Sequence, residues 1–262
     1  MKPTEINDRK YFQEYHNRIG KDVAALWKNA DLKNGNLDLA YHITASAVYS
    51  SNIEGNTLDL NSYMNYELTK KKFKPTKEAQ EIKDLKVAYV FAKTHVLTEK
   101  NFLKAHEIFS SSYLIKNKRG KYRTEKVGVF SERGLVYLAV EPELVSDEMK
   151  LFFASLKKLL KEKFNVEEAF YFASLEHLKF VHIHPFADGN GRAARLLEKW
   201  FLSRFLGNDV WKFSSEQFYK EHRQEYYNNI NLGVNYYELN YEKCLPFLEM
   251  LAKALKKTNT KI

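Results

Sequence analysis

Cysteine, proline and glycine are scarce in this 262-residue chain, and each shortage excludes a class of structure. The single cysteine, Cys244, excludes an intramolecular disulfide, and no Cys/His cluster has the spacing of a zinc site. With 5 Pro and 10 Gly the chain has few turn formers, which argues against a turn-rich sandwich or barrel. A hydrophobic share of 44% and a charged share of 29% exclude a disordered or collagen-like chain and predict a globular one.

Long hydrophobic runs are also missing. No stretch approaches the ~18 apolar residues that would cross a bilayer. The first residues, Met1 to Phe12, are polar and charged, unlike a secretory signal peptide. We therefore expect a cytoplasmic protein with no membrane partner.

The chain is rich in aromatic residues and carries a net positive charge. The 18 Phe, 17 Tyr and 3 Trp predict a densely packed core. The 42 Lys and Arg exceed the 33 Asp and Glu, and the net charge of +9 would attract phosphorylated ligands, nucleic acid or acidic proteins. The lysine runs are dispersed, which favours solvated helix faces over a nucleic-acid site; they lie at 70–72, 157–163 and 253–261.

Apolar residues recur at three- and four-residue spacing along most of the chain, which predicts helices. Asn36 and Thr76 are expected N-caps, and Pro142 is expected in the first turn of its helix. The predicted helices span 7–29, 37–54, 60–71, 76–96, 99–113, 142–163, 166–182, 190–206, 214–232 and 241–256.

One segment, residues 121–140, has the pattern of a β-hairpin. Two runs of β-branched and aromatic residues flank a polar turn, Ser131 to Gly134. An isolated hairpin is only marginally stable, so this one must lie against the helices or pair with another chain.

The segment HPFADGNGRAAR, residues 184–195, carries the most chemical information. Pro185 disfavours helical geometry at His184, and the glycines allow close approach to a ligand before a new helix begins. Free amides at a helix start, with Arg192 and Arg195 three residues apart, make a site for phosphates. Asp188 suits Mg²⁺ and His184 suits a proton acceptor. A tight turn, an N-cap and two solvated arginines would explain each feature singly, but not twelve consecutive positions together.

These residues match the H-x-F-x-[DE]-G-N-G-R-x-x-R signature of the Fic (filamentation induced by cAMP) domain family. The resemblance implies an all-α Fic fold, a helical bundle with one β-hairpin flap. It implies a protein adenylyltransferase that uses ATP and Mg²⁺ to transfer AMP to a Ser, Thr or Tyr hydroxyl of a target protein, or of itself.

The resemblance also assigns roles within the loop. His184 resembles the base and Asp188 the Mg²⁺ ligand, while Phe186 is similar to the buried anchor of the loop. The cradle for the α- and β-phosphates corresponds to Gly189, Asn190 and Gly191. The clamps for the β- and γ-phosphates correspond to Arg192 and Arg195.

Two features near the loop refine this assignment. A lysine replaces Gly191 in the Doc-like branch, whose members are kinases, so glycine favours nucleotidyl transfer. His182, outside the signature, could form a metal site with His184, but a plain histidine at a helix end explains it better.

An upstream segment, SSNIEGN at 50–56, places Ser50 and Glu54 on one helix face, with Gly55 as a helix stop. Alone it predicts only an exposed glutamate beside a C-cap glycine. Beside the signature it resembles the [ST]-x-x-x-E-[GN] inhibitory motif of the class with an N-terminal inhibitory helix, here about 37–54. The resemblance implies that Glu54 pairs with Arg195 and so keeps it from the γ-phosphate.

Weaker resemblances extend the match. Tyr226, Tyr227 and Asn235 are similar to a Y-Y-x(7)-N pattern that contacts adenosine, although core packing explains Tyr226 equally well. The hairpin 121–140 lies where relatives dock their target.

We expect an N-terminal region 1–96, a catalytic core 97–256 and a tail 257–262. The predicted function is adenylyl transfer, autoinhibited by Glu54. Removal of AMP with the help of Glu54, or a nucleotide-binding module without turnover, stays open, as does a homodimer.

Overall fold

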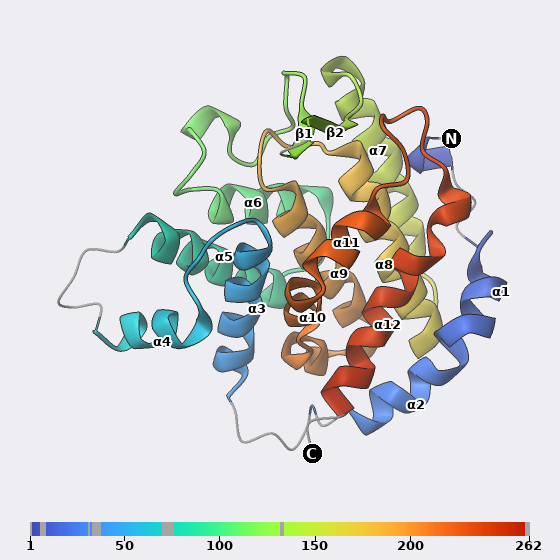
Figure 1. Cartoon of the computed structure of the whole chain (residues 1–262), viewed down its shortest axis with the longest axis horizontal. Coiled ribbons are helices and arrows are strands. Elements are labelled where there is room, and N and C mark those ends of the chain that lie inside the picture. The colour runs from blue at the N-terminus through green and yellow to red at the C-terminus, as the bar shows by residue number, and fades with distance from the viewer. Residues whose placement is uncertain are drawn as a thin grey trace.

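The computed structural model describes residues 2–5, 9–30, 32, 38–69, 76–131 and 134–259, with the side chains of 131 and 257–259 left aside. Within these residues it is a bundle of helices with one β-hairpin at one end (Figure 1). The helices are α1 (Phe12–Tyr15), α2 (Lys21–Asn29), α3 (Leu39–Ile53), α4 (Leu60–Thr69), α5 (Lys77–Thr94), α6 (Glu99–Phe109), α7 (Pro142–Leu159), α8 (Val166–Ile183), α9 (Asn190–Leu206), α10 (Ser215–Glu221), α11 (Arg223–Ile230) and α12 (Leu245–Asn259). Short 3₁₀ turns cover Pro3–Glu5, Lys116–Lys118, Asn208–Lys212 and Tyr241–Lys243, and a π-helical turn covers His16–Gly20.

Two neighbouring helices, α8 and α9, form the centre of the bundle. Every residue of α8 from Ala169 to Ile183 is buried, so this helix has no solvent face from its fourth residue to its end. Helix α9 packs along α8, α3 and α5 flank α9, and α12 covers α8 (Figure 1). A helix that is buried on all sides belongs to the middle of a domain, which explains why its sequence is so aromatic.

The predicted all-α fold with one hairpin is confirmed within the described residues. Strands β1 (Gly128–Ser131) and β2 (Gly134–Leu138) pair antiparallel, with Val129 opposite Tyr137 and an irregularity after Val129. The strands are shorter than the predicted 121–140, and the turn residues 132–133 lie outside the described part. A third segment joins the hairpin, because the amide of Leu138 donates to the carbonyl of Val234.

Helix starts follow the local sequence where a cap is available. Thr76 accepts a hydrogen bond from the amide of Ala79, and Pro142 occupies the first turn of α7, both as predicted. Helix α3 begins at Leu39 with Asp38 at the N-cap position, and the predicted cap Asn36 lies outside the described residues.

Two predicted helices are wrong as single elements. The span 214–232 divides at His222 (φ −110°, ψ 36°) into α10 and α11, and no Gly or Pro marks the break. The span 7–29 contains the π-helical turn between α1 and α2, and its first two residues lie outside the described part. Apolar spacing persists through both irregularities, so periodicity alone does not reveal them.

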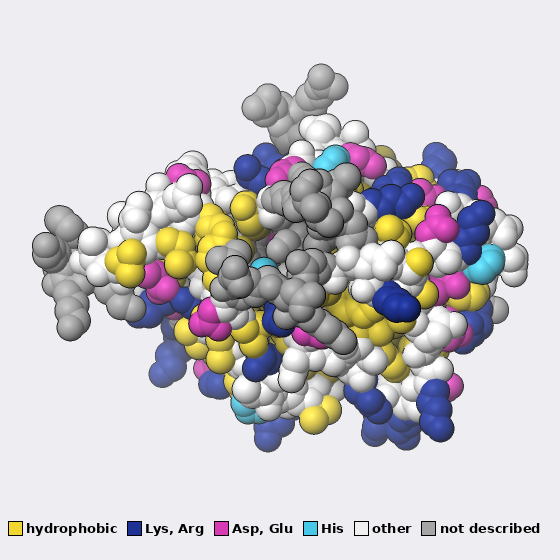
Figure 2. Space-filling model, turned by 90° about the horizontal axis from the view of Figure 1, so that it is seen from below, with side chains coloured by type: hydrophobic (Ala, Val, Ile, Leu, Met, Phe, Trp, Pro, Cys, Tyr) yellow, Lys and Arg dark blue, Asp and Glu magenta, His cyan; other side chains and the backbone are white. Residues whose placement is uncertain are grey.

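The surface of one face fits the predicted dispersal of positive charge. Figure 2 shows Lys and Arg side chains scattered among acidic and apolar ones on this face, without a continuous basic stripe. Among the described residues, no helix has the length and apolar composition needed to traverse a lipid bilayer.

Candidate functional site

The loop between α8 and α9 owes its shape to three local features. His184 ends α8 in the left-handed conformation (φ 53°, ψ 57°), which is uncommon for a residue other than glycine, while Pro185 disfavours a continued right-handed helix at this position. The buried ring of Phe186 anchors the turn. The side chain of Asn190 then closes it, because its Oδ1 accepts from the amide of Phe186 and its Nδ2 donates to the same residue's carbonyl, both at 2.9 Å. Asn190 therefore shapes the loop with its side chain.

His106 on α6 supports the loop from outside, a contact that the sequence did not reveal. Its Nδ1 accepts from the amide of Gly120 at 2.9 Å, so the proton is on Nε2, which donates to the carbonyl of Asp188 at 3.1 Å. The ring also stacks on Phe186, with centroids 3.7 Å apart. Burial lowers the pKa of His106 to about 4, which keeps the imidazole neutral in these contacts.

Arg123, which precedes the hairpin, is a second support that sequence reasoning missed. Its Nε donates to the carbonyl of His184 at 2.8 Å and its amide donates to the carbonyl of Pro185 at 2.9 Å. Nη2 donates to the carbonyl of Val140, at the other end of the hairpin segment. One buried guanidinium thus ties the hairpin to the loop between α8 and α9.

His184 has the arrangement that a general base needs. Its Nδ1 lies 3.1 Å from the carbonyl of Val181, which can only accept, so Nδ1 carries the proton and Nε2 keeps its lone pair. Burial and the nearby charge of Arg123 lower the pKa of His184 below its usual value. The imidazole is therefore neutral, and able to take a proton, at neutral pH.

The start of α9 presents amide groups to an anion. The first intrahelical bond of α9 runs from the amide of Ala193 to the carbonyl of Gly189, so the amides of Asn190, Gly191 and Arg192 precede the ladder. Gly189 holds φ 86°, and a Cβ there would overlap the hydroxyl of Tyr113. These unbonded amides and the positive end of the helix suit phosphate oxygens.

Arg192 and Asp188 flank this helix start. The guanidinium of Arg192 lies over the ring of Tyr113 with its centre 4.0 Å from the centroid, and Nη2 donates to Asp188 Oδ1 at 3.3 Å. Its Nη1 is 3.9 Å from Glu81 Oε2. The Nε of Arg192 is buried without a hydrogen-bond partner, so this side chain keeps one unsatisfied donor.

Asp188 is the carboxylate placed to take a metal. Its side chain is 57% exposed and Oδ1 also accepts from the amide of Gly189. Among the described residues, no group of three or more His, Cys, Asp and Glu could hold a metal by itself. Mg²⁺ commonly needs only one or two carboxylates when phosphate oxygens and waters complete its shell, so Asp188 fits that kind of site.

Glu54 reaches the same place from α3. Its Oε1 accepts from Nη2 of Arg195 at 2.7 Å, so the predicted pairing of these two residues is present. The carboxylate lies directly above Gly191, where a Cβ would overlap Oε1 and stand 3.1 Å from Cδ. Burial by itself would raise the pKa of Glu54, but Arg195 and Arg192 outweigh it and the pKa is lowered, so the side chain is an anion. A carboxylate therefore already occupies the anion site.

Arg195 is fully buried and is held on two sides. Its Nε donates to the hydroxyl of Ser50 on α3, and its Nη2 donates to the carbonyl of the same residue, both at 2.9 Å. Tyr226 on α11 accepts from Nη1 at 3.2 Å. Burial would lower the pKa of Arg195, but Tyr226 and Glu54 raise it, so the guanidinium stays charged.

The three residues expected near adenosine differ in burial and in hydrogen-bond partners, although the rings of Tyr226 and Tyr227 touch. Tyr226 is 1% exposed, within the core. Tyr227 is 37% exposed and its hydroxyl donates to the carbonyl of Ile53, the last residue of α3, at 3.0 Å. Asn235 closes a local turn with its side chain, accepting from the amides of Tyr237 and Glu238.

His182 is a structural residue. It is buried, with Nδ1 2.8 Å from the hydroxyl of Tyr241 and Nε2 2.8 Å from the carbonyl of Ile230. Both ring nitrogens are occupied by protein groups, which agrees with the structural explanation that the sequence favoured.

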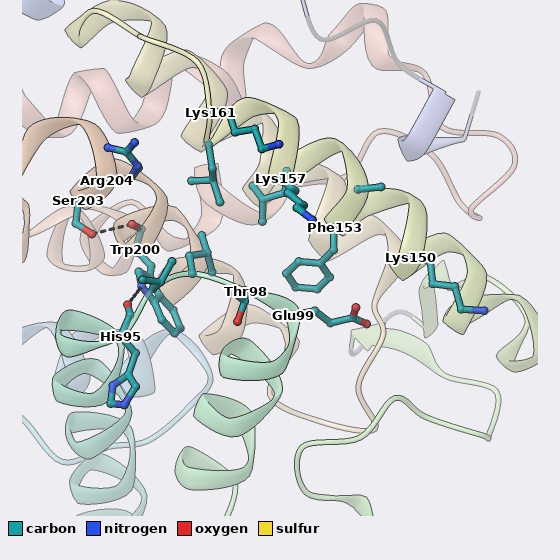
Figure 3. A pocket seen from close by; sticks show the side chains of 15 residues that line it. His95, Thr98, Glu99, Lys150, Phe153, Lys157, Lys161, Trp200, Ser203 and Arg204 are labelled. Atoms are coloured by element: carbon teal, nitrogen blue, oxygen red, sulfur yellow. Dashed lines mark hydrogen bonds between the residues drawn. The ribbon is translucent and has the colours of Figure 1, made fainter.

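A cavity of about 630 Å³ lies away from the loop, between α7 and the C-terminal half of α9 (Figure 3). Phe153 and Trp200 line it, with Lys150, Lys157 and Arg204 around them. The indole of Trp200 donates to the carbonyl of His95. Because none of the residues 184–195 lines this cavity, the chemistry of the loop does not extend into it.

Curated proteins with sequence similarity match part of this chain. Protein adenylyltransferase Fic of Nematostella vectensis is 30% identical over 140 residues, which cover 53% of this chain and 28% of that protein. Protein adenylyltransferase Fic of Aedes aegypti is 33% identical over 99 residues, covering 36% and 17%. The chain thus matches less than a third of the length of either relative.

Solved structures share the whole fold. A Fic family protein from Desulfovibrio desulfuricans has a TM-score of 0.76 at 21% identity, covering 99% of this chain and 75% of that one. A fragment of Fic-1 from C. elegans has a TM-score of 0.65 at 22% identity, covering 96% and 70%. Residues 96–202 match the sequence profile of the Fic/DOC family. This chain therefore contains a Fic domain of the Fic/DOC family.

Proposed function

We propose that the protein transfers AMP from ATP to a Ser, Thr or Tyr hydroxyl of a target protein, or of itself. The observation that carries the proposal is the placement of a neutral histidine, His184, on the same short loop as the anion-binding start of α9. A phosphate chain bound at the amides of Asn190 to Arg192 would bring its phosphorus atoms close to that base. The names of the curated relatives support this reaction.

The proposed step is a displacement at the α-phosphorus. His184 Nε2 takes the proton of the acceptor hydroxyl, whose oxygen forms the new bond to the α-phosphorus. The bond from that phosphorus to the oxygen bridging the β-phosphate breaks, and pyrophosphate leaves with the electron pair. Arg192 and Arg195 balance the charge that grows on the leaving group.

The proposed cofactor is Mg²⁺, held by Asp188 together with phosphate oxygens. When bound, the ion neutralises phosphate charge and fixes the polyphosphate conformation. Asp188 contributes through an exposed carboxylate at the mouth of the site. The same carboxylate also accepts from Arg192, so it links the proposed metal position to one of the phosphate clamps.

Glu54 supplies a brake in this proposal. Its carboxylate lies over Gly191 and bonds Arg195, so it fills the place that a terminal phosphate would need. ATP could still bind by its other phosphates, but its α-phosphorus would not be aligned with the hydroxyl that His184 activates. The parent protein is therefore expected to be largely inactive until Glu54 moves.

The target is expected to dock at the hairpin. The apolar side chains of Phe130 and Leu135 are 71% and 53% exposed on β1 and β2. An extended segment of a target could add a strand there and bring its hydroxyl to the loop, because Arg123 fixes the hairpin to His184. A homodimer is compatible with the proposal, which does not require one.

The experiment compares three proteins, the parent, Glu54→Gly, and Glu54→Gly/His184→Ala, with Mg²⁺, α-labelled ATP and cell lysate. Label on protein is expected with Glu54→Gly alone. If Glu54→Gly and the parent label equally, Glu54 is not a brake. If no variant transfers label although each binds ATP, adenylyl transfer is wrong. If label that Glu54→Gly has attached is removed by the parent, Glu54 serves the reverse reaction.

A further inference from the structure

A chain of buried polar groups leads from Arg195 into the core. Arg195 Nη1 lies 3.2 Å from the hydroxyl of Tyr226, which lies 2.9 Å from His177 Nε2. His177 Nδ1 lies 2.8 Å from Glu198 Oε2. The three supporting residues come from α11, α8 and α9, and each is at most 1% exposed.

The hydrogen-bond directions in this chain are set by Arg195. A guanidinium can only donate, so the hydroxyl oxygen of Tyr226 accepts from it and its proton is free for His177. His177 Nε2 then accepts from the hydroxyl, and Nδ1 donates to Glu198. Each of the four residues has a hydrogen-bond partner in this arrangement, and the buried Glu198 Oε1 is the one atom of the relay without a partner.

We propose that Tyr226, held by His177 and Glu198, is a positioning residue for Arg195 and does not contact adenosine. The inference rests on the proposed function, in which Arg195 binds the terminal phosphate of ATP. Because Tyr226 is 1% exposed and its hydroxyl is used on both sides, the side chain has no surface left for a nucleotide base.

The role of Tyr226 becomes essential when the brake is released. Ser50 and Glu54 both belong to the α3 segment, so a shift of that segment withdraws all their contacts with Arg195 together. Tyr226 belongs to α11 and keeps its contact. Of the hydrogen bonds described for Arg195, the one to Tyr226 then remains and holds the guanidinium near the start of α9.

The test uses Glu54→Gly as background and calorimetric affinities for ATP and ADP. Tyr226→Phe removes the hydroxyl but keeps the ring, and we expect about tenfold weaker ATP binding with little change for ADP, the effect of one charge-assisted hydrogen bond. Glu198→Gln, which does not touch Arg195, is expected to shift the same ratio by about threefold. Equal losses for ATP and ADP in Tyr226→Phe would indicate an adenosine contact and overturn the proposal.

A matched control separates positioning from stability. Tyr241→Phe deletes another buried hydroxyl, one that donates to His182 Nδ1 at 2.8 Å and bonds none of Arg195, Tyr226, His177 and Glu198. We expect it to lower the free energy of unfolding and keep the ATP-to-ADP ratio. A change of that ratio as large as the one in Tyr226→Phe would contradict the proposal.

Two further measurements distinguish failure of this proposal from failure of the proposed function. Arg195→Ala should abolish the ATP preference, and a preference that survives would refute the phosphate role of Arg195. Hydrogen exchange at Arg195 Nη1, which bonds Tyr226 and neither Ser50 nor Glu54, can be followed by NMR without nucleotide and tests the relay separately from phosphate binding. It is expected to be slow in Glu54→Gly and at least tenfold faster after Tyr226→Phe, and an unchanged rate would refute the relay.

Discussion

The contact between Glu54 and Gly191 predicts an energetic coupling that can be measured without substrate. An alanine Cβ at position 191 would overlap Glu54 Oε1, and the carboxylate would have to leave Arg195. Gly191 does not have a positive φ, so its backbone accepts alanine. The change Gly191→Ala should therefore act on stability in opposite directions with and without Glu54.

The magnitudes follow from burial and helix propensity. Loss of a fully buried ion-pair partner costs about 3–5 kcal/mol, but the Glu54 side chain is 30% exposed and can turn to water, so about 1–2 kcal/mol is expected. Alanine in a helix is more stable than glycine by roughly 0.5–1 kcal/mol. Gly191→Ala should thus lower the free energy of unfolding of the parent by about 0.5–1 kcal/mol. It should raise that of Glu54→Gly by a similar amount once Arg195 Nη1, 3.1 Å from the new Cβ, moves by a few tenths of an ångström.

Urea unfolding of the four proteins of this double-mutant cycle is the assay. The coupling free energy between the two positions is expected to be about 1–2 kcal/mol. Contacting residues show such coupling, whereas distant ones add within roughly 0.3–0.5 kcal/mol. Additive effects of Glu54→Gly and Gly191→Ala would mean that the carboxylate does not lie over α9 in solution, and the proposed brake would lose its structural basis.

Three further outcomes can be checked. Tyr227→Phe removes a donor to the last carbonyl of α3 and should raise AMP transfer by the parent about fivefold, since Glu54 is held less firmly; unchanged transfer would contradict this. Because the pKa of His184 is lowered, transfer by Glu54→Gly should be constant above pH 6.5 and fall in acid, and a rate that rises only above pH 7.5 would refute a neutral base. Burial lowers the pKa values of His106 and His182 to about 4, so as the pH falls these residues take up protons in the unfolded chain before they do so in the folded one. The free energy of unfolding should therefore fall by about 3 kcal/mol for each histidine between pH 6.5 and 4. Urea unfolding that gives the same pH slope after His182→Gln would contradict this prediction.

The loop was predictable from the sequence because its determinants are adjacent in the chain. The end of the helix at His184, before Pro185, and the turn at Gly189 are local consequences of residue type, whereas the left-handed conformation of His184 is not. The link from Glu54 to Arg195 crosses 141 positions and came from resemblance to a family motif, not from spacing.

The supports of the site could not be predicted in this way. Arg123 and His106 reach the loop from segments that no local pattern connects to it. From the sequence, an arginine or histidine that caps a turn elsewhere cannot be distinguished from one that supports the loop between α8 and α9. A pattern of residue types and spacing linked Tyr226 to adenosine. Only the structure shows that its hydroxyl bonds Arg195 and His177 inside the core.

The most direct test of the central claim is which phosphate of ATP reaches protein. Glu54→Gly would be incubated with Mg²⁺, cell lysate and ATP labelled at either the α- or the γ-phosphate, with Glu54→Gly/His184→Ala as the matched inactive protein. The account predicts protein-bound label from α-labelled ATP alone, and none with the double variant. Label from γ-labelled ATP, or equal labelling by the double variant, would contradict adenylyl transfer with His184 as the base.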